Sequence, residues 1–448
     1  MLNKILRSCC VLILATAATA QAAPPNIVFI MADDLGWADV AFNDHQGNAP
    51  TRHLKQLAAK SLELTQHYVA PVCSPTRTAL LTGRCWSRFG ITSPTNTLAL
   101  PPDTITLAHA LKSQGYETCL TGKWHLGSLP KWGPNHFGFD HSYGSLAGGI
   151  TSFTHRYKKG PYSITWHRNE TLIEEEGHVT DLLTNEAVTW IAGNSERGSK
   201  PFFLYVPFTA VHLPVNETKD WLDEVPATIT KPIARQYAAC IMHLDHSVGR
   251  ILQALDHHDL RRNTLVVFTS DNGGSWATNN TRPYPLDDSL PGKLTASNKP
   301  LRDQKGSVYE GGTRVPTLVS WSGKVVAGKI STPVFIADWM PTFCKLTGFQ
   351  TDRDLAWDGT DLSSLLTKGT EIAERPIYIA GPNWRACSLR IGDWKLVESN
   401  NKQRYELYNI AEDPSEKTNL ASTYLKRVTS MMVTLAEVRA ADNDRVVK

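Results

Sequence analysis

The amino-acid sequence predicts an α/β protein: a mixed, mostly parallel sheet flanked by helices, followed by a smaller C-terminal subdomain of antiparallel sheet and helix. Three observations predict this fold. Short apolar runs end in polar residues, amphipathic segments separate those runs, and short strand-like pieces replace them beyond residue 370. The 448 residues suffice for one large domain, expected over 23–350, and a small one, expected over 371–448.

Four apolar runs, rich in Val, Ile and Phe, are typical of buried strands in a parallel sheet. Because ligands of an open α/β sheet sit outside the carboxyl ends of its strands, we expect the polar residues after these runs to share one site. A turn-forming role explains any single one of them, but it explains the whole set poorly. The runs span 26–31, 117–121, 201–208 and 263–269, and they are followed by Asp33 and Asp34, Lys123 and His125, His212, and Asp271 and Asn272, respectively.

Helices are expected over 54–68, 107–114 and 234–256. The third carries Ile, Leu and Val at steps of three and four residues, which is typical of an amphipathic helix. Its His243, Asp245 and His246 alternate with that stripe and are assigned to the solvated face.

The remaining segments are a loop, a last helix and a C-terminal tail. The loop over 276–300, rich in Asn, Pro, Asp and Ser, is interpreted as a substrate-facing lid. A helix over 336–346 and a linker over 347–370 are expected to end the main domain. In the tail we expect turns at Asn383 and Gly392, a helix over 424–440, and strands over 376–379, 388–391, 394–398 and 405–409.

The composition, with 41% hydrophobic and 20% charged residues, is that of an ordinary soluble globular protein. The net charge of +3 includes Lys4 and Arg7, which lie in a segment expected to be removed. The mature chain is then close to neutral, so its charge favours neither nucleic acid nor an anionic membrane as a partner. Residues 1–22 have the form of a secretory signal peptide, and no apolar run is long enough to span a bilayer. We therefore expect an exported protein, periplasmic or secreted.

The cysteines after the signal segment fit neither a zinc site nor a disulfide scaffold, and most are interpreted as buried apolar residues. They are Cys73, Cys85, Cys119, Cys240, Cys344 and Cys387. If Cys73 is modified, five remain, so at least one is a free thiol or pairs with another chain.

The strand-end residues include a set of hard oxygen donors: Asp33, Asp34, Asp271 and Asn272. Such a set favours Ca²⁺ or Mg²⁺ over zinc. Adjacent carboxylates also cap helices and form turns, so Asp33 with Asp34 alone is a weak signal. With a second pair at another strand end, the sequence predicts one calcium ion, whose remaining contacts come from a modified Cys73 and from substrate.

Residues 71–83, PVCSPTRTALLTG, place a cysteine in an unusual setting. Pro75 suits the first turn of a helix, so Cys73 is expected at a helix N-terminus, where backbone N–H groups favour negative charge. Arg77 lies one turn further on the same face. An ordinary cysteine with a lowered pKa beside a cation is the alternative, but it does not account for the whole string. The string resembles, at each defined position, the sulfatase motif whose cysteine is oxidised to Cα-formylglycine.

Residues 25–440 resemble the type I sulfatases of the alkaline phosphatase superfamily in the order of their motifs. Residues 115–125, GYETCLTGKWH, resemble the second sulfatase motif, and 300–312, PLRDQKGSVYEGG, contain a further lysine of the family, Lys305. The resemblance implies an alkaline-phosphatase-like fold and a sulfuric ester hydrolase. It also implies a formylglycine-generating maturation enzyme as a partner.

The resemblance implies a role for each site residue. Cys73 becomes formylglycine (3-oxoalanine), whose hydrate is the nucleophile, and Arg77 holds that hydrate. His125 contacts its hydroxyl, Lys123 and Lys305 bind sulfate oxygens, and His212 faces the leaving oxygen. A hydrated aldehyde has a second hydroxyl whose deprotonation expels the transferred sulfate, an exit that an ordinary Ser or Cys lacks. The cations match the charge that develops on the sulfate oxygens.

Within the family, the stretches 138–144 and 154–156 resemble N-acetylgalactosamine-4-sulfatase (arylsulfatase B) and its bacterial relatives. This implies an exo-acting enzyme on the galactose-type 4-sulfate of a sulfated oligo- or polysaccharide. Lys299 and Tyr309 depart from it, since they stand where tryptophans are expected. His155 and Arg156 are candidate contacts to a second anionic group, or plain surface residues. The alternatives are a phosphonate or phosphate ester hydrolase of the superfamily and an unmodified sulfated-glycan binding protein.

Overall fold

The computed structural model describes residues 24–43, 49–158, 160–198, 200–280, 284, 288–399 and 404–446. The predicted signal peptide, 1–22, lies outside these residues. The described chain contains a ten-stranded mixed sheet. The order across this sheet is β14 (Gly328–Ile330), β2 (Leu62–Leu64), β13 (Leu318–Ser320), β9 (Thr264–Ser270), β1 (Asn26–Ala32), β8 (Phe202–Pro207), β4 (Glu117–Lys123), β5 (His141–Ser145), β6 (Trp166–Arg168) and β7 (Thr171–Leu172).

The central strands run parallel and end at the same level. β1 pairs in parallel with β9 on one side and β8 on the other, and β4 pairs in parallel with β8 and β5. The last pairs of β1 join Ala32 to Ser270 and Met31 to Pro207. The four runs predicted as parallel strands are confirmed, and their register brings the residues that follow them to one edge of the sheet.

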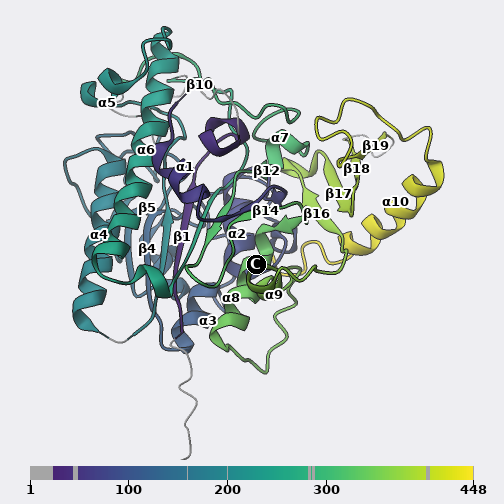
Figure 1. Cartoon of the computed structure of the whole chain (residues 1–448), viewed down its shortest axis with the longest axis horizontal. Helices are drawn as coiled ribbons and strands as arrows, with labels where there is room; N and C mark the ends of the chain where they lie inside the picture. The colour runs from purple at the N-terminus through teal and green to yellow at the C-terminus, as the bar shows by residue number, and fades with distance from the viewer. Residues whose placement is uncertain are drawn as a thin grey trace, which may run out of the picture.

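Helices cover both faces of this sheet. One apolar core packs α2 (Cys73–Thr82), α3 (Leu107–Ser113) and α8 (Trp339–Thr347) against Ile27, Phe29 and Met31 of β1. The other packs α1 (Arg52–Ala58), α4 (Val179–Arg197) and α6 (Pro232–His257) against Val28 and Ile30. Side chains alternate along a strand, so β1, buried throughout, supplies both cores. Figure 1 shows α4 and α6 side by side along one flank of the molecule.

A four-stranded antiparallel sheet and a helix form the C-terminal part, on the opposite flank in Figure 1. This sheet shares the apolar core of α2, α3 and α8, and Trp86 Nε1 donates to the Ala380 carbonyl at 3.0 Å. The predicted strands and helix are confirmed, whereas the domain boundaries stay a prediction. The elements are β16 (Ile377–Ala380), β17 (Cys387–Ile391), β18 (Trp394–Glu398), β19 (Tyr405–Asn409) and α10 (Leu425–Arg439).

Three sequence expectations need correction. The helix expected over 54–68 ends at Ala58, because 62–64 pairs with β13 and β14 and 67–68 pairs in a second small sheet. The expected loop over 276–300 contains two short paired strands, and the expected linker over 347–370 contains a helix. The remaining α-helices and strands are β3 (His67–Tyr68), α5 (Lys219–Glu224), β10 (Thr278–Asn279), β11 (Gly292–Lys293), α7 (Glu310–Thr313), β12 (Arg314–Val315), β15 (Val334–Phe335) and α9 (Ser363–Lys368).

The assignment of three α6 residues to a solvated face holds for His246 but is wrong for His243 and Asp245. Asp245 accepts the backbone N–H groups of His53 and Leu54 at 2.9 and 2.8 Å, and so caps the start of α1. The side chain of His243 is fully buried, with its ring nitrogens 3.0 Å from Glu217 and 3.2 Å from Asp181. Residues of other segments therefore cover part of the polar face of α6 as well as its apolar stripe.

The buried His243 predicts a pH-dependent stability. Burial alone lowers the pKa of His243, but the Asp181 and Glu217 carboxylates outweigh burial and raise it to about 9, from 6.5. The attraction between charged His243 and its two carboxylates therefore stabilises the fold fully below pH 6.5. This contribution is lost as the pH rises through about 9. At pH 6, His243→Gln is expected to lower the free energy of unfolding by about 3 kcal/mol.

Melting temperatures measured from pH 6 to pH 10 check this prediction. The wild type should lose stability across this range, and His243→Gln should lose much less. His246→Gln, which changes the exposed histidine one position beyond Asp245, is the matched control and should follow the wild type. Identical pH slopes for all three proteins would contradict the assignment.

Candidate active site

The residues predicted to share a site meet at the carboxyl edge of the central strands. Asp33 and Asp34 follow β1, and Asp271 and Asn272 follow β9. Lys123 ends β4, and His125 and His212 lie in the loops after β4 and β8. Direct contacts join these segments, so the structure brings together residues up to about 240 positions apart in the chain.

Cys73 begins α2, as the sequence predicts, and it lines the same cavity as His125 and His212. The preceding Val72 is extended, and Pro75 lies in the first turn. The Thr76 hydroxyl accepts the backbone N–H of Ala70 at 2.9 Å and donates to the Asp271 carbonyl at 2.6 Å. This bond ties the start of α2 to the end of β9. Cys73 is 2% exposed and belongs to neither apolar core.

Three buried carboxylates each pair with one cation. Lys123 Nζ lies 2.6 Å from Asp33 Oδ2, Lys305 Nζ lies 2.6 Å from Asp34 Oδ1, and an Arg77 nitrogen lies 2.8 Å from Asp271 Oδ2. Arg77 also donates to the Lys123 carbonyl at 2.6 Å, which links α2 to β4. Charges of this kind are buried at acceptable cost only when they are paired. The sequence-predicted cations and carboxylates therefore form one interlocked set.

Two oxygens of this set lack a hydrogen-bond partner within the described residues: Asp33 Oδ1 and Asn272 Oδ1 are buried and unpartnered. The carboxylates also crowd one another. Burial, with the neighbouring Asp271, raises the pKa of Asp33 well above its usual range. Burial also acts to raise the pKa of Asp34, but Lys305 and His212 outweigh it and lower that pKa. A hard divalent cation would relieve this crowding and take up the free oxygens, so the donors fit Ca²⁺ or Mg²⁺.

His125 and His212 lie against a pair of glycines, Gly148 and Gly149. A Cβ added at Gly148 would come within 2.3 Å of His125 Cε1, and one at Gly149 within 2.8 Å of His212 Cε1. Only glycine therefore leaves room for both rings. Sequence reasoning missed this pair, although two adjacent glycines soon after a strand are a signal of close backbone approach.

The two rings are held in a cationic, buried setting. Burial, together with Lys123 for His125 and Lys305 for His212, lowers the pKa of both histidines well below the usual value. His212 Nε2 lies 3.9 Å from Asp34 Oδ2, while its Nδ1 contacts the Leu213 carbonyl. His125 has a left-handed backbone with φ of 58°, as does Asp34 with φ of 64°. Such non-glycine conformations gather at functional sites.

Burial raises the pKa of the Cys73 thiol, because desolvation outweighs the nearby Lys123 and Lys305 ammonium groups. This direction does not favour the alternative of an ordinary cysteine with a lowered pKa. In the described part of the chain, the six cysteines considered above are free and buried, which confirms the prediction that most of them are buried residues.

A cavity of about 730 Å³ opens directly above these residues. Its floor includes Asp34, Cys73, His125, His212 and Lys305. Residues of the 276–300 segment and of the C-terminal part line the same cavity, including Tyr284, Arg385, Val397 and Ser399. This size suits a sugar residue rather than a bare inorganic anion. Sequence reasoning did not place the C-terminal sheet at the site.

The structure does not bring His155 and Arg156 to this cavity. His155 is buried and stacks on Trp166 with ring centroids 4.5 Å apart, and Arg156 pairs with Glu174. Both line a separate, smaller cavity that also contains Glu174, Glu175 and Glu176. The predicted contact of these two residues to a second anionic group finds no support in this geometry, because Glu174 already pairs with the guanidinium and the neighbouring glutamates would repel an anion.

Taken together, the floor of the cavity can hold a tetrahedral anion against fixed positive charge. Lys305, Lys123 and Arg77 supply that charge, and oxygen donors for a divalent cation lie beside them. Cys73 supplies the position from which a nucleophile can act, at the N-terminus of α2. The arrangement suits transfer of a sulfuryl or phosphoryl group.

Comparisons with known proteins agree with this chemistry. The family model described as sulfatase matches residues 25–349. The chain is 30% identical to arylsulfatase J of Mus musculus, over 96% of this chain and 79% of the relative. It is 32% identical to N-acetylgalactosamine-6-sulfatase of Mus musculus, over 83% and 71% of the two chains. The solved structure of Ps i-CgsB is 32% identical with a TM-score of 0.84, over 94% of this chain and 93% of that one, and a complex of it contains k-i-k-neocarrahexaose.

Proposed function

The chain belongs to the sulfatase family and is a sulfuric ester hydrolase of alkaline-phosphatase-like fold, and we propose that it works through formylglycine at position 73. We propose further that it is exported and removes a galactose-type 4-sulfate from the end of a sulfated glycan. The observation that carries the mechanism is the position of Cys73, which begins α2 on the floor of the same cavity as Lys305, His125 and His212.

The proposed metal is one Ca²⁺, held by Asp33, Asp34, Asp271, Asn272 and the modified Cys73. The unpartnered Asp33 Oδ1 and Asn272 Oδ1 support this assignment. When bound, the ion supplies positive charge that stabilises the transferred sulfuryl group.

Within the described residues, none of the helices is both long and apolar enough to cross a membrane.

The remaining roles fall to this chain's own side chains. Lys123 and Lys305 bind sulfate oxygens, and Arg77 stabilises the charge on the side chain formed at Cys73. Arg77 is fully buried and paired with Asp271, so its position is set before substrate binds. His125, packed on Gly148, orients the nucleophilic hydroxyl. His212, packed on Gly149 and lining the cavity, faces the leaving oxygen.

A panel of esters tests the proposal against its alternatives. Sulfated mono- and oligosaccharides, with free sulfate as the readout, are compared with matched phosphate and phosphonate esters. The proposal expects sulfate release to exceed phosphate release by orders of magnitude in kcat/KM. Faster phosphate or phosphonate ester turnover would favour the alternative hydrolase. Tight glycan binding without any turnover would favour an unmodified binding protein.

The same panel tests the sulfated position. The 4-sulfate assignment rests on the resemblance in 138–144 and 154–156, although a relative of this chain is named N-acetylgalactosamine-6-sulfatase. The proposal expects the fastest release from terminal 4-sulfated galactose or N-acetylgalactosamine. Faster release from a 6-sulfated sugar would overturn the position and leave the sulfatase assignment in place.

Replacing His212 by alanine is expected to damage turnover of a sulfated sugar more than turnover of nitrophenyl sulfate. A sugar alkoxide is a poor leaving group that needs help from a proton or a hydrogen bond, whereas nitrophenolate leaves without it. We expect a loss of kcat/KM of about 10²-fold or more on the sugar and about tenfold or less on the aryl ester. Equal losses on both substrates would contradict this role for His212.

A further inference from the structure

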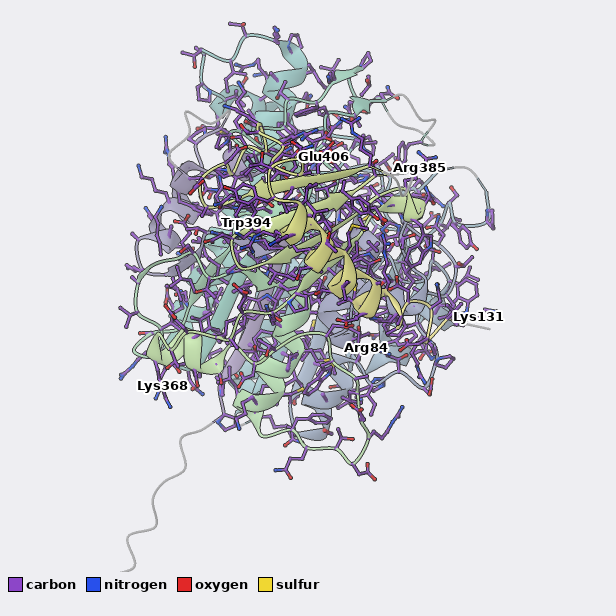
Figure 2. All side chains as sticks on the ribbon, turned by 90° about the vertical axis from the view of Figure 1, so that its right-hand side faces the viewer. Arg84, Lys131, Lys368, Arg385, Trp394 and Glu406 are labelled. Carbon is purple, nitrogen blue, oxygen red and sulfur yellow. The ribbon has the colours of Figure 1, made fainter. Side chains whose placement is uncertain are left out.

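The active-site cavity extends well beyond the residues that hold the sulfate. Its floor lies at the carboxyl ends of the central strands, and its lining continues through Tyr157, Lys158 and Tyr284, together with Arg385 from the C-terminal part, here called the wall. Figure 2 shows Arg385 at the end of the C-terminal sheet that lies away from Trp394. The pairing of β17 with β18 agrees, since Trp394 pairs with Ile391 and Cys387 pairs with Glu398 at the other end. Arg385, two residues before Cys387, therefore lies at the end of this sheet that borders the cavity.

The cations of this wall differ from those of the floor. Each floor cation is paired with a carboxylate at 2.6 to 2.8 Å. Within the described residues, by contrast, neither Lys158 nor Arg385 forms an ion pair. Lys158 contacts the adjacent Tyr157, 3.3 Å from its hydroxyl and 5.0 Å from its ring centroid, and Arg385 is exposed. In the described part of the chain, these two cations of a ligand cavity thus have no negative partner.

Among the described residues, two carboxylates line the cavity, and neither forms an ion pair with Lys158 or Arg385. They are Asp34, which Lys305 and Asn272 already engage, and Asp303, which lies two residues before Lys305. The described residues of the wall therefore carry positive charge that a ligand extending from the floor can meet. A guanidinium presents a fork of donors that matches a sulfate ester or a carboxylate.

We propose that Lys158 and Arg385 form a second anion subsite, which binds a sulfate ester or a carboxylate on the sugar next to the one that loses its sulfate. This inference rests on the proposed function and specifies its substrate class: a glycan with a negative charge on each of two neighbouring sugars. Tyr157, whose ring lies under Lys158, also lines the cavity beside this subsite. The subsite takes over the contact that the sequence assigned to His155 and Arg156.

Three matched disaccharides test the subsite. All carry the sulfate that is removed, and the second sugar is uncharged, sulfated or a uronic acid. For the wild type, kcat/KM is expected to be about tenfold higher on a doubly charged disaccharide, because a charge-assisted hydrogen bond is stronger than a neutral one. The doubly charged disaccharide with the higher kcat/KM shows whether the subsite prefers a sulfate ester or a carboxylate. The preference should shrink as salt is raised from 0.05 to about 0.5 M.

Arg385→Gln and Lys158→Gln are each expected to reduce this preference severalfold, and the double variant to abolish it. Arg385→Lys should retain part of it, since the charge stays while the fork is lost. Lys368→Gln removes an exposed charge on α9, away from the cavity, and should leave the preference unchanged. A preference that survives in the double variant, or that is absent from the wild type, overturns the subsite.

Binding to the Cys73→Ala protein separates this proposal from the proposed function. Calorimetry is expected to give a Kd about tenfold lower for the doubly charged disaccharide, and Arg385→Gln in the same background should remove the difference. Equal affinities for the charged and uncharged disaccharides would overturn the subsite while the sulfatase assignment stands. Failure of all three disaccharides to bind or to be hydrolysed would overturn the proposed function, and the subsite with it.

Discussion

Cys73→Ala is expected to abolish sulfate release from glycans while the protein stays folded. Removing a nucleophile from an otherwise intact site lowers kcat by about 10⁴-fold or more, because only charge stabilisation and binding remain. The fold should survive, since Cys73 lies at the first turn of α2 and in neither apolar core. Initial rates of sulfate release and melting temperatures of the two proteins, measured side by side, check this prediction.

Cys344→Ala provides the matched control. Cys344 is also a buried free thiol, but it lies on α8 within the apolar core and remote from the cavity lining. Its replacement should lower stability by about 1 kcal/mol and leave kcat near the wild-type value. A Cys73→Ala protein that retains more than a tenth of the wild-type kcat would rule out position 73 as the nucleophile.

Asp271→Ala is expected to lose the metal ion and activity together, and to lose stability as well. Asp271 pairs with Arg77 at 2.8 Å, and both side chains are fully buried. Its removal leaves a buried guanidinium without its carboxylate, a change that costs about 3–5 kcal/mol. Elemental analysis of the purified protein, before and after dialysis, measures the retained metal.

A second variant separates metal loss from misfolding. Asn272→Leu removes the unpartnered amide oxygen but keeps all three ion pairs, so it should weaken metal retention with a much smaller loss of stability. The wild type treated with a chelator is the reference: it should lose activity by about 10³-fold and regain it with Ca²⁺ or Mg²⁺. Stoichiometric zinc in the active protein, without calcium or magnesium, would contradict the oxygen-donor assignment.

The sequence predicts the floor of the site well because strand ends carry local signals. Each central strand is a short apolar run followed at once by its polar residue, and parallel register then brings these residues to one edge. The sequence predicts the position of Cys73 for the same reason, because Pro75 marks the start of α2 from within the motif. These features depend on neighbours in the chain and so can be read without the fold.

The features that the sequence did not predict depend on contacts between distant segments. Arg385 reaches the cavity because the C-terminal sheet shares an apolar core with α2, and no local pattern near residue 385 reports that contact. The apolar stripe of α6 predicts a solvated His243, yet Trp221 stacks on its ring and the Glu217 and Asp181 carboxylates lie against its two nitrogens. The separate cavity of His155 and Arg156 likewise depends on Glu174, which lies 18 residues further along the chain.

The mass of the Cys73 peptide in active enzyme tests the central claim most directly. Conversion of the thiol to the aldehyde lowers the mass by about 18 Da and removes the group that alkylating agents label. We predict that, after denaturation, alkylating agents label the other buried cysteines, such as Cys344, while the Cys73 peptide carries the lower mass. The fraction of the Cys73 peptide with the lower mass should rise in proportion to the specific activity of the preparation. A fully active preparation in which Cys73 is alkylated quantitatively would contradict the formylglycine mechanism.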